Sequence, residues 1–282
     1  MITTTTTVHA AFGEVPVTYT DQGEGHPFLL LHGGAGSQSV RAFADLLATT
    51  RHARVISPTN PGFDGTPRPA ELATIKDLAA THLALLDALD LRDVTIIGNS
   101  IGGWTAAEMA LAASPRVSSV ILVDAVGLTD DVGPMRDFFG LAWHEVEDYS
   151  YNEPDRFRTD LDALPAAAKQ NMAGNRATML AVAGRAMGDP TLLARLPRIT
   201  TPVLVVWGAA DGIVPLSHGR AYRDAIPGAE LDIIDTAGHL PQLETPERLV
   251  HDVWQFADQH AAFRPQDGGT PGADRKVFSG PR

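Results

Sequence analysis

The stretch VTIIGNSIGG, residues 94–103, decides the fold. It opens with a short apolar run whose β-branched residues favour a buried strand over a helix. A helical pattern begins at Ile101, so Ser100 falls on the turn between the strand and the helix. In this context the G-x-S-x-G motif exposes a serine hydroxyl at the edge of a sheet. We therefore predict that Ser100 is a nucleophile.

Similar runs on both sides of this stretch indicate further strands. Each is short and apolar, and we predict strands at residues 28–31, 53–57, 94–98, 119–124, 203–207 and 231–235. Helical periodicity separates several of them, with helices predicted at 75–89 (capped by Thr74), 101–113 and 249–261. Strands that alternate with helices predict a parallel, doubly wound sheet. Residues 8–12 and 15–19, with a turn at Gly13-Glu14, predict an antiparallel hairpin before it.

Residues 129–197 contain no convincing strand and are predicted to form a helical insert. We divide the chain into a core of residues 1–128 and 198–263, a helical cap of residues 129–197, and a tail of residues 264–282. The tail is rich in glycine, proline and charge, which predicts disorder. The insert carries large apolar side chains that either pack on the core or form one wall of an apolar pocket: Phe138, Phe139, Trp143, Tyr149, Tyr151, Met172, Met179 and Met187.

A serine nucleophile needs a base and an acid, and position along the chain chooses among ten histidines. His239 follows the last predicted strand, and the loops at the carboxyl ends of parallel strands share one edge of a sheet with Ser100. Asp211, directly after the strand at 203–207, is the predicted acid, and Asp124 is the second choice. Asp235 is too close to His239 along the chain. The resulting order is Ser100, Asp211, His239.

The tetrahedral intermediate of acyl transfer also needs amide donors for its oxyanion. One predicted donor is the N–H of Ile101. The other comes from the glycine-rich run HGGAG, residues 32–36, where we favour Gly34 and keep Gly33 as the alternative. No phosphate-loop or dinucleotide fingerprint is present, and no H-E-x-x-H or similar metal-ligand spacing appears. We expect neither a metal nor an organic cofactor.

These segments together resemble the α/β-hydrolase-fold serine hydrolases. The matching pieces are residues 32–34, 60–63, 98–103, 207–211 and 238–239. The resemblance runs from about residue 28 to 256, outside the insert. It implies an α/β fold with a mostly parallel eight-stranded sheet and a helical cap over the site. The triad Ser100, Asp211 and His239 and the oxyanion hole of Gly34 and Ile101 then occupy the family's positions.

The subgroup is indicated by residues 98–103, which resemble the elbow of meta-cleavage C–C bond hydrolases. In those enzymes the asparagine of the elbow, here Asn99, contacts a polar part of the substrate. They usually have tryptophan after the catalytic histidine, where this chain has Leu240, and they use an arginine of the cap. Arg176 and Arg185 are the candidates here.

The substrate contacts predicted beyond the triad are Gly33, Asn99, Trp143 and Leu240. Asp64 stands where glycine is common in the family, and we interpret it as a loop residue facing solvent rather than as a residue at the mouth of the site.

Composition excludes several other classes. The chain has no cysteine, which removes disulfides, thiolate catalysis and cysteine-bound zinc. Its net charge is −12 and no basic stripe is present, which argues against nucleic acid and anionic membranes as partners. The N-terminus lacks the features of a secretory signal, and no apolar run approaches the ~18 residues of a membrane span. We expect a cytoplasmic protein whose partner is a small-molecule substrate. The sequence leaves the oligomeric state open.

The resemblance implies a carboxylic ester hydrolase that uses the triad on an ester, thioester or lactone of a small, largely apolar molecule. Two alternatives stay open: C–C bond hydrolysis of a meta-cleavage-type diketone, and a ligand-binding receptor on the same fold. Epoxide hydrolases and haloalkane dehalogenases are disfavoured, because those relatives carry aspartate at the elbow.

Overall fold

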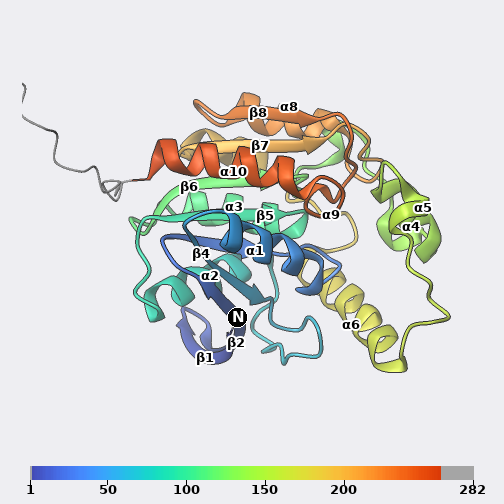
Figure 1. Cartoon of the computed structure of the whole chain (residues 1–282), viewed down its shortest axis with the longest axis horizontal. Helices are drawn as coiled ribbons and strands as arrows, with labels where there is room; N and C mark the ends of the chain where they lie inside the picture. The colour runs from blue at the N-terminus through green and yellow to red at the C-terminus, as the bar shows by residue number, and fades with distance from the viewer. Residues whose placement is uncertain (1, 262–282) are drawn as a thin grey trace, which may run out of the picture.

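The computed structural model describes residues 2–261 and is built around one eight-stranded sheet (Figure 1). The strand order is β1-β2-β4-β3-β5-β6-β7-β8. β2 is antiparallel to both of its neighbours, and every pairing from β4 to β8 is parallel. The predicted fold class is thereby confirmed. The strands are β1 (Ile2–Ala10), β2 (Gly13–Gly23), β3 (His26–Leu31), β4 (Ala53–Thr59), β5 (Val94–Asn99), β6 (Val117–Val123), β7 (Val203–Gly208) and β8 (Glu230–Ile234).

Helices cover both faces of the sheet, and each layer encloses its own apolar core. One core packs α1 (Gln38–Thr50) and α10 (Pro246–His260) against the sheet, in front in Figure 1. The other packs α2 (Ile75–Ala88), α3 (Ile101–Leu111) and α8 (Leu216–Ala225) on the opposite face. The central strands β5 and β7 are buried along their whole length. Both of their faces are covered, which explains why their sequences are largely apolar.

Local signals account for the positions of several elements. Thr74 caps α2 as predicted: its hydroxyl accepts from the N–H of Asp77, whose carboxylate accepts from the N–H of Thr74 in return. The helices α1 and α8 were not singled out from the sequence. Both are amphipathic helices of moderate length that lack a side-chain cap, so no start signal marks them.

The hairpin at the N-terminus differs from its prediction in two respects. The tight turn is Ala11-Phe12 rather than Gly13-Glu14, because Ala10 and Gly13 still pair across the two strands. The first strand also begins at Ile2 instead of residue 8. The threonines at 3–7 lie on an edge strand that is exposed to solvent. Threonine favours a strand because it is β-branched, and its hydroxyl is polar enough to face water.

Residues 129–197 contain helices, and Gly188 among them forms an isolated bridge with Gly127, just before this region. Figure 1 shows α4, α5 and α6 gathered beyond the ends of the strands, on the right of the view. The division into core and cap remains a prediction, and the tail at 264–282 lies outside the described residues. The elements here are η1 (Asp130–Val132), η2 (Phe138–Gly140), α4 (Trp143–Ser150), α5 (Pro154–Phe157), α6 (Ala166–Ala183), α7 (Leu192–Arg195) and η3 (Leu196–Arg198). A last short helix, α9 (Pro241–Glu244), precedes α10.

Across residues 2–261, none of the helices combines the length and the apolar character that crossing a bilayer requires.

Candidate active site

Ser100 occupies a strained turn between β5 and α3. Its backbone angles, φ 58° and ψ −117°, lie outside the regions that side chains other than glycine normally adopt. The chain can make this turn because glycines flank it. A Cβ on Gly98 would come 2.1 Å from the carbonyl oxygen of Gly102, and a Cβ on Gly102 would come 2.4 Å from that of Leu31. The G-x-S-x-G spacing is therefore a steric requirement of this turn.

His239 and Asp211 form a hydrogen-bonded pair beside this turn. The Nδ1 atom of His239 lies 2.7 Å from Oδ2 of Asp211, and both side chains are almost fully buried. The other oxygen of Asp211 accepts from the backbone N–H groups of Ile213 at 2.8 Å and Val214 at 2.9 Å. Because a carboxylate can only accept, Nδ1 of His239 carries the proton, and Nε2 is left free to act as a base.

Asp124, the second choice for the acid, lies close to both Asp211 and His239, but the hydrogen bond of the imidazole is with Asp211. It follows β6 with a left-handed backbone (φ 45°) and is completely buried. Its Oδ1 accepts from the N–H of Gly208 at 2.8 Å. Burial and the neighbouring carboxyl of Asp211 raise the pKa of Asp124 well above its usual range.

Asp124, Asp211 and His239 place their ligand atoms within 4.8 Å of one another, close enough to surround a metal ion. The Nδ1 atom of the imidazole and both oxygens of Asp211 are already used in hydrogen bonds inside the protein. The donor set therefore fits a hydrogen-bonded triad better than a cation site.

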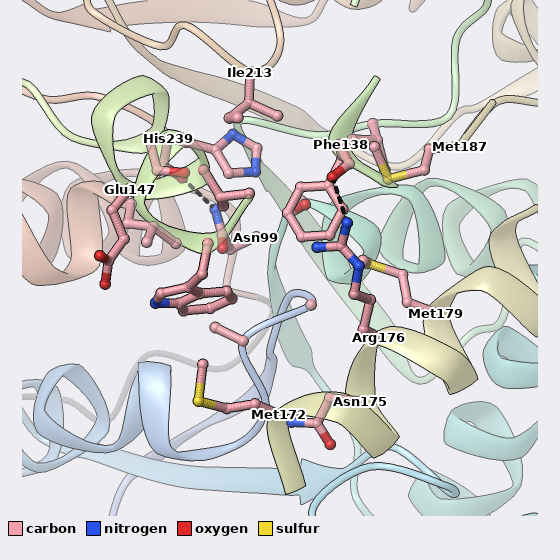
Figure 2. Close-up of a pocket in the computed structure, with 18 of the residues that line it drawn as sticks. Asn99, Phe138, Glu147, Met172, Asn175, Arg176, Met179, Met187, Ile213 and His239 are labelled. Atoms are coloured by element: carbon pink, nitrogen blue, oxygen red, sulfur yellow. Dashed lines mark hydrogen bonds between the residues drawn. The ribbon is translucent and has the colours of Figure 1, made fainter. Parts of the chain in front are cut away.

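A cavity of about 840 Å³, its open mouth included, joins Ser100 to His239. Its walls are predominantly apolar and come from the ends of the sheet strands and from the 129–197 region (Figure 2). Of the apolar residues singled out in that region, six line the cavity: Phe138, Trp143, Tyr151, Met172, Met179 and Met187. The size and lining are those of a pocket for a small organic molecule.

The residues predicted for binding divide into two groups. Gly34, Asn99, Trp143 and Leu240 line the cavity, whereas Gly33 and Ile101 are not part of its wall. The carbonyl of Gly33 accepts from Nδ1 of His32, which is fully buried and serves the loop's structure. Ile101 is the first residue of α3, so its N–H is at the helix start next to Ser100.

Asn99 is more tightly held than a substrate contact requires. Its Nδ2 donates to the carbonyl of His239 at 3.0 Å, shown as a dashed line in Figure 2, and its Oδ1 accepts from Gln242 at 3.2 Å. The side chain thus fixes the backbone of the histidine loop to the end of β5.

Arg176 and Arg185, the two candidates for a cap arginine, lie in different places. Arg185 is exposed and forms an ion pair with Asp137 at 2.5 Å. Arg176 lines the cavity, with its guanidinium 4.9 Å from the ring centre of Phe138 and one nitrogen donating to the carbonyls of Phe138 and Leu141. Among the described residues that line the cavity, it is the only lysine or arginine.

The interpretation of Asp64 as a solvent-facing loop residue is wrong. Its Oδ2 accepts from the N–H and the hydroxyl of Ser37, its Oδ1 accepts from Nδ2 of Asn175 at 2.9 Å, and its own N–H donates to Oδ1 of Asn175 at 2.7 Å. Although burial opposes ionisation, these hydrogen bonds lower the pKa of Asp64. The side chain connects α6 to the loops beside the site, a long-range contact that no local sequence pattern encodes.

Several lining residues were not predicted from the sequence. They are Val126, Val146, Glu147, Ser150, Asn175 and Ile213. Ile213 was in principle accessible, because it lies two residues after Asp211. Val126 follows β6 by three residues, and the remaining four depend on the path of the 129–197 region, which has no recognisable motif.

The end of α4 contacts the loops that carry the histidine and the acid. The carbonyl of Ser150 accepts from the N–H of His239 at 2.6 Å, and that of Tyr149 accepts from the N–H of Gly212 at 2.9 Å. The backbone next to both members of the His–Asp pair is therefore fixed by α4.

This sheet, with a strained serine at the turn after β5 and glycine-rich loops at the same edge, has the architecture of the α/β hydrolases. A model of the alpha/beta hydrolase family matches residues 28–253, and the chain belongs to that family.

The chain is also similar to curated relatives and to solved structures. The chain is 29% identical to the 2-hydroxymuconate semialdehyde hydrolase of Pseudomonas putida, over 84% of this chain and 88% of the relative. It is 28% identical to the 2-hydroxy-6-oxo-6-(2'-aminophenyl)hexa-2,4-dienoic acid hydrolase of Metapseudomonas resinovorans, over 88% and 90% of the two chains. A thermophilic esterase from Thermogutta terrifontis shares the fold with a TM-score of 0.74 at 23% identity, covering 92% of this chain and 99% of the esterase.

Proposed function

We propose that this chain is a serine hydrolase that cleaves an acyl bond, as in an ester, thioester or lactone, of a small and largely apolar molecule. The observation that carries the proposal is the strained backbone of Ser100 at a cavity that also contains His239, whose Nδ1 is 2.7 Å from Asp211. A strained backbone persists only where the surrounding structure enforces it, and such residues cluster at active sites.

In the proposed reaction Nε2 of His239 takes the proton of Ser100 as its Oγ attacks the substrate carbonyl. Asp211 keeps the proton of the imidazole on Nδ1 and stabilises the imidazolium that forms. The N–H groups of Ile101 and Gly34 stabilise the oxyanion. His239 then protonates the leaving group, and water hydrolyses the acyl-enzyme by the same steps in reverse.

The lining of the cavity indicates the kind of acyl group. Met172, Met179 and Met187 present flexible thioethers, which adapt to irregular apolar shapes. Phe138 and Trp143 add flat aromatic surface. We expect a preference for medium-sized apolar or aromatic acyl groups over charged ones.

A second candidate is hydrolysis of a C–C bond in a vinylogous diketone that bears a carboxylate. It is favoured by Arg176, a guanidinium at the cavity wall with donors beyond those used by Phe138 and Leu141. The two bacterial relatives, whose names describe hydrolases of semialdehyde and dienoic acid compounds, support the same candidate. Arg176 would bind the carboxylate in a bidentate pair.

The first test replaces Ser100 with alanine. We expect kcat for p-nitrophenyl esters to fall by a factor of about 10⁴ to 10⁶, because removing a triad residue lowers kcat by this much. Labelling by a fluorophosphonate probe should disappear, because the probe reacts with the serine hydroxyl. Ser114→Ala, at the opposite end of the sheet, is the matched control and should keep full activity. A Ser100→Ala variant that retains a tenth of the activity would exclude Ser100 as the nucleophile.

The second test separates the candidates. Purified protein is assayed with p-nitrophenyl esters and with a 2-hydroxy-6-oxo-dienoate, and Arg176→Met is compared with the parent on both. Turnover of the dienoate by the parent that is lost in Arg176→Met supports C–C hydrolysis. Turnover of the esters by both proteins, with no turnover of the dienoate by either, supports acyl hydrolysis. Labelling by the probe without turnover of either substrate would indicate a receptor on this fold.

A further inference from the structure

Asp124 is a buried titratable group that the proposed reaction does not use. It lies after β6, at the same edge of the sheet as Asp211 and His239, and none of its side chain reaches solvent. A carboxyl group in such a place costs free energy unless hydrogen bonds compensate it. A residue that only filled space here would be apolar.

The two oxygens of Asp124 have different surroundings. Oδ1 accepts from the N–H of Gly208, the last residue of β7. Oδ2 has no N–H or O–H partner among residues 2–261. A carboxylate oxygen of Asp124 lies within 4.8 Å of one of Asp211. Two buried carboxyl groups this close avoid repulsion when one of them carries a proton, and only then can they share a hydrogen bond.

The hydrogen-bond donors around the pair decide which carboxyl holds the proton. Asp211 accepts from three N–H groups, those of Ile213, Val214 and His239. Asp124 accepts from one. Hydrogen bonds donated to a carboxylate stabilise its ionised form, so the charge resides on Asp211 and the proton on Asp124. Glu244, whose carboxylate accepts from Gly238, adds negative charge nearby and disfavours a second ionised group further.

We propose that Asp124 is a positioning residue that stays protonated and donates a hydrogen bond to Asp211, fixing the carboxylate that orients His239. The inference rests on the proposed function, because it assigns a role within the same triad. Asp124 does not touch the substrate and acts through Asp211.

Asp124→Asn and Asp124→Leu make a pair of test variants, because asparagine has the size and shape of aspartate and leucine keeps the branch at Cγ, although it is larger. The asparagine variant would keep a donor toward Asp211 and an acceptor for Gly208, whereas the leucine variant keeps neither and fills the space against water. Asparagine also tolerates the left-handed backbone at this position, so Asp124→Asn should fold.

The expected result is rescue by the conservative variant. Asp124→Asn should retain kcat/KM within about threefold of the parent and leave the acidic limb of the pH profile where it is. Asp124→Leu should lose at least about tenfold in kcat and move that limb to higher pH, because an Asp211 that has lost a donor attracts the imidazolium more strongly.

Two outcomes would overturn the proposal. A shift of the acidic limb to lower pH by about a unit or more in Asp124→Asn would mean that an ionised Asp124 supports His239 directly. Identical pH profiles for the asparagine and leucine variants would mean a purely structural role.

Two measurements without turnover keep the inference separate from the proposed function. The imidazole of His239 is titrated by NMR in the parent and Asp124→Asn, and the midpoint should not move. The infrared band of a protonated carboxylic acid at neutral pH should be present in the parent and absent from Asp124→Asn; its absence from the parent excludes the proposal even if Asp124→Leu fails to fold. If Ser100→Ala stays active, the proposed function fails whatever these spectra show.

Discussion

Asp211 uses both of its carboxylate oxygens, which makes it sensitive to replacement by its own amide. Oδ1 receives two backbone N–H groups, and Oδ2 receives the imidazole N–H. An asparagine has one acceptor oxygen. That oxygen is needed where the two backbone donors converge, so the NH₂ group would face His239.

We therefore predict that Asp211→Asn folds normally but loses about 10⁴ in kcat. A donor opposite Nδ1 forces the imidazole proton onto Nε2, and His239 can then no longer accept the proton of Ser100. Steady-state kinetics with a p-nitrophenyl ester measures the loss, and circular dichroism controls for folding. A loss smaller for Asp211→Asn than for Asp124→Asn would make Asp124 the acid.

At the scale of single residues, sequence reasoning succeeded where backbone geometry dictates the residue type. The turn at Ser100 needs glycine at positions 98 and 102, so the glycine spacing in the sequence was enough to predict this turn. It failed for Asp64, because its partners Ser37 and Asn175 lie 27 and 111 residues away in the chain. Asn99, predicted to contact substrate, lines the cavity and also forms hydrogen bonds with His239 and Gln242, and its contact with substrate stays a prediction.

At the scale of elements, α6 is held over the site by a few polar contacts. Asn175 pairs with Asp64 through two hydrogen bonds, and Thr178 donates to the carbonyl of Gly62 at 2.8 Å. Met179, one residue further, faces Gly34, where an added Cβ would come 2.6 Å from its sulfur. The position of α6 thus sets how closely the thioether approaches the loop predicted to bind the oxyanion.

We predict that Asn175→Ala raises KM for bulky apolar esters by about tenfold and changes kcat for p-nitrophenyl acetate little. The variant loses two hydrogen bonds, one of them to a carboxylate, which are together worth about 1–3 kcal/mol, and ~1.4 kcal/mol corresponds to a factor of ten in binding. Asn171→Ala, exposed on the same helix, is the control. Equal effects on large and small substrates would contradict a role for α6 in substrate binding.

The elements that the sequence predicted well are those with a solid apolar run or a cap. All six predicted core strands are present, each shifted by two residues or fewer at its ends, and α2 begins at its predicted cap. The order of the helices in the 129–197 region could not be derived. Their lengths and angles result from packing over the cavity, and the short elements η2, α5 and α7 have no periodicity to detect.

At the scale of the whole molecule, buried histidines link folding to pH. His82 donates to Oδ1 of Asn60, and the N–H of Asn60 donates to His32; both rings are completely buried. Burial, with a smaller contribution from His32, lowers the pKa of His82 to about 3. In the unfolded chain the same group titrates near 6.5. Stability is therefore complete above pH 6.5 and is lost as pH falls, since the unfolded state takes up the proton first.

We predict that the free energy of unfolding falls by about 2 kcal/mol between pH 7 and pH 5 on account of His82 alone, at about 1.4 kcal/mol per pH unit. His82→Gln, which can still donate to Asn60, should remove that part of the slope. Urea unfolding at the two pH values measures it, with the exposed His251→Gln as the control. The same loss in both variants would show that His82 is protonated in the folded protein.

The carbonyls of Tyr149 and Ser150 at the end of α4 restrict how this scaffold can be recombined. Relatives with different pockets invite exchange of the whole 129–197 segment as a specificity module. Here the carbonyls of the segment also accept hydrogen bonds from the N–H groups of Gly212 and His239. A chimera that displaces residues 149–150 by about an ångström would therefore displace the His–Asp pair and lower activity on every substrate. Productive grafts would keep residues 149–150 of the recipient and exchange only the later part of the segment, where Met172 and Met179 contact the ligand space.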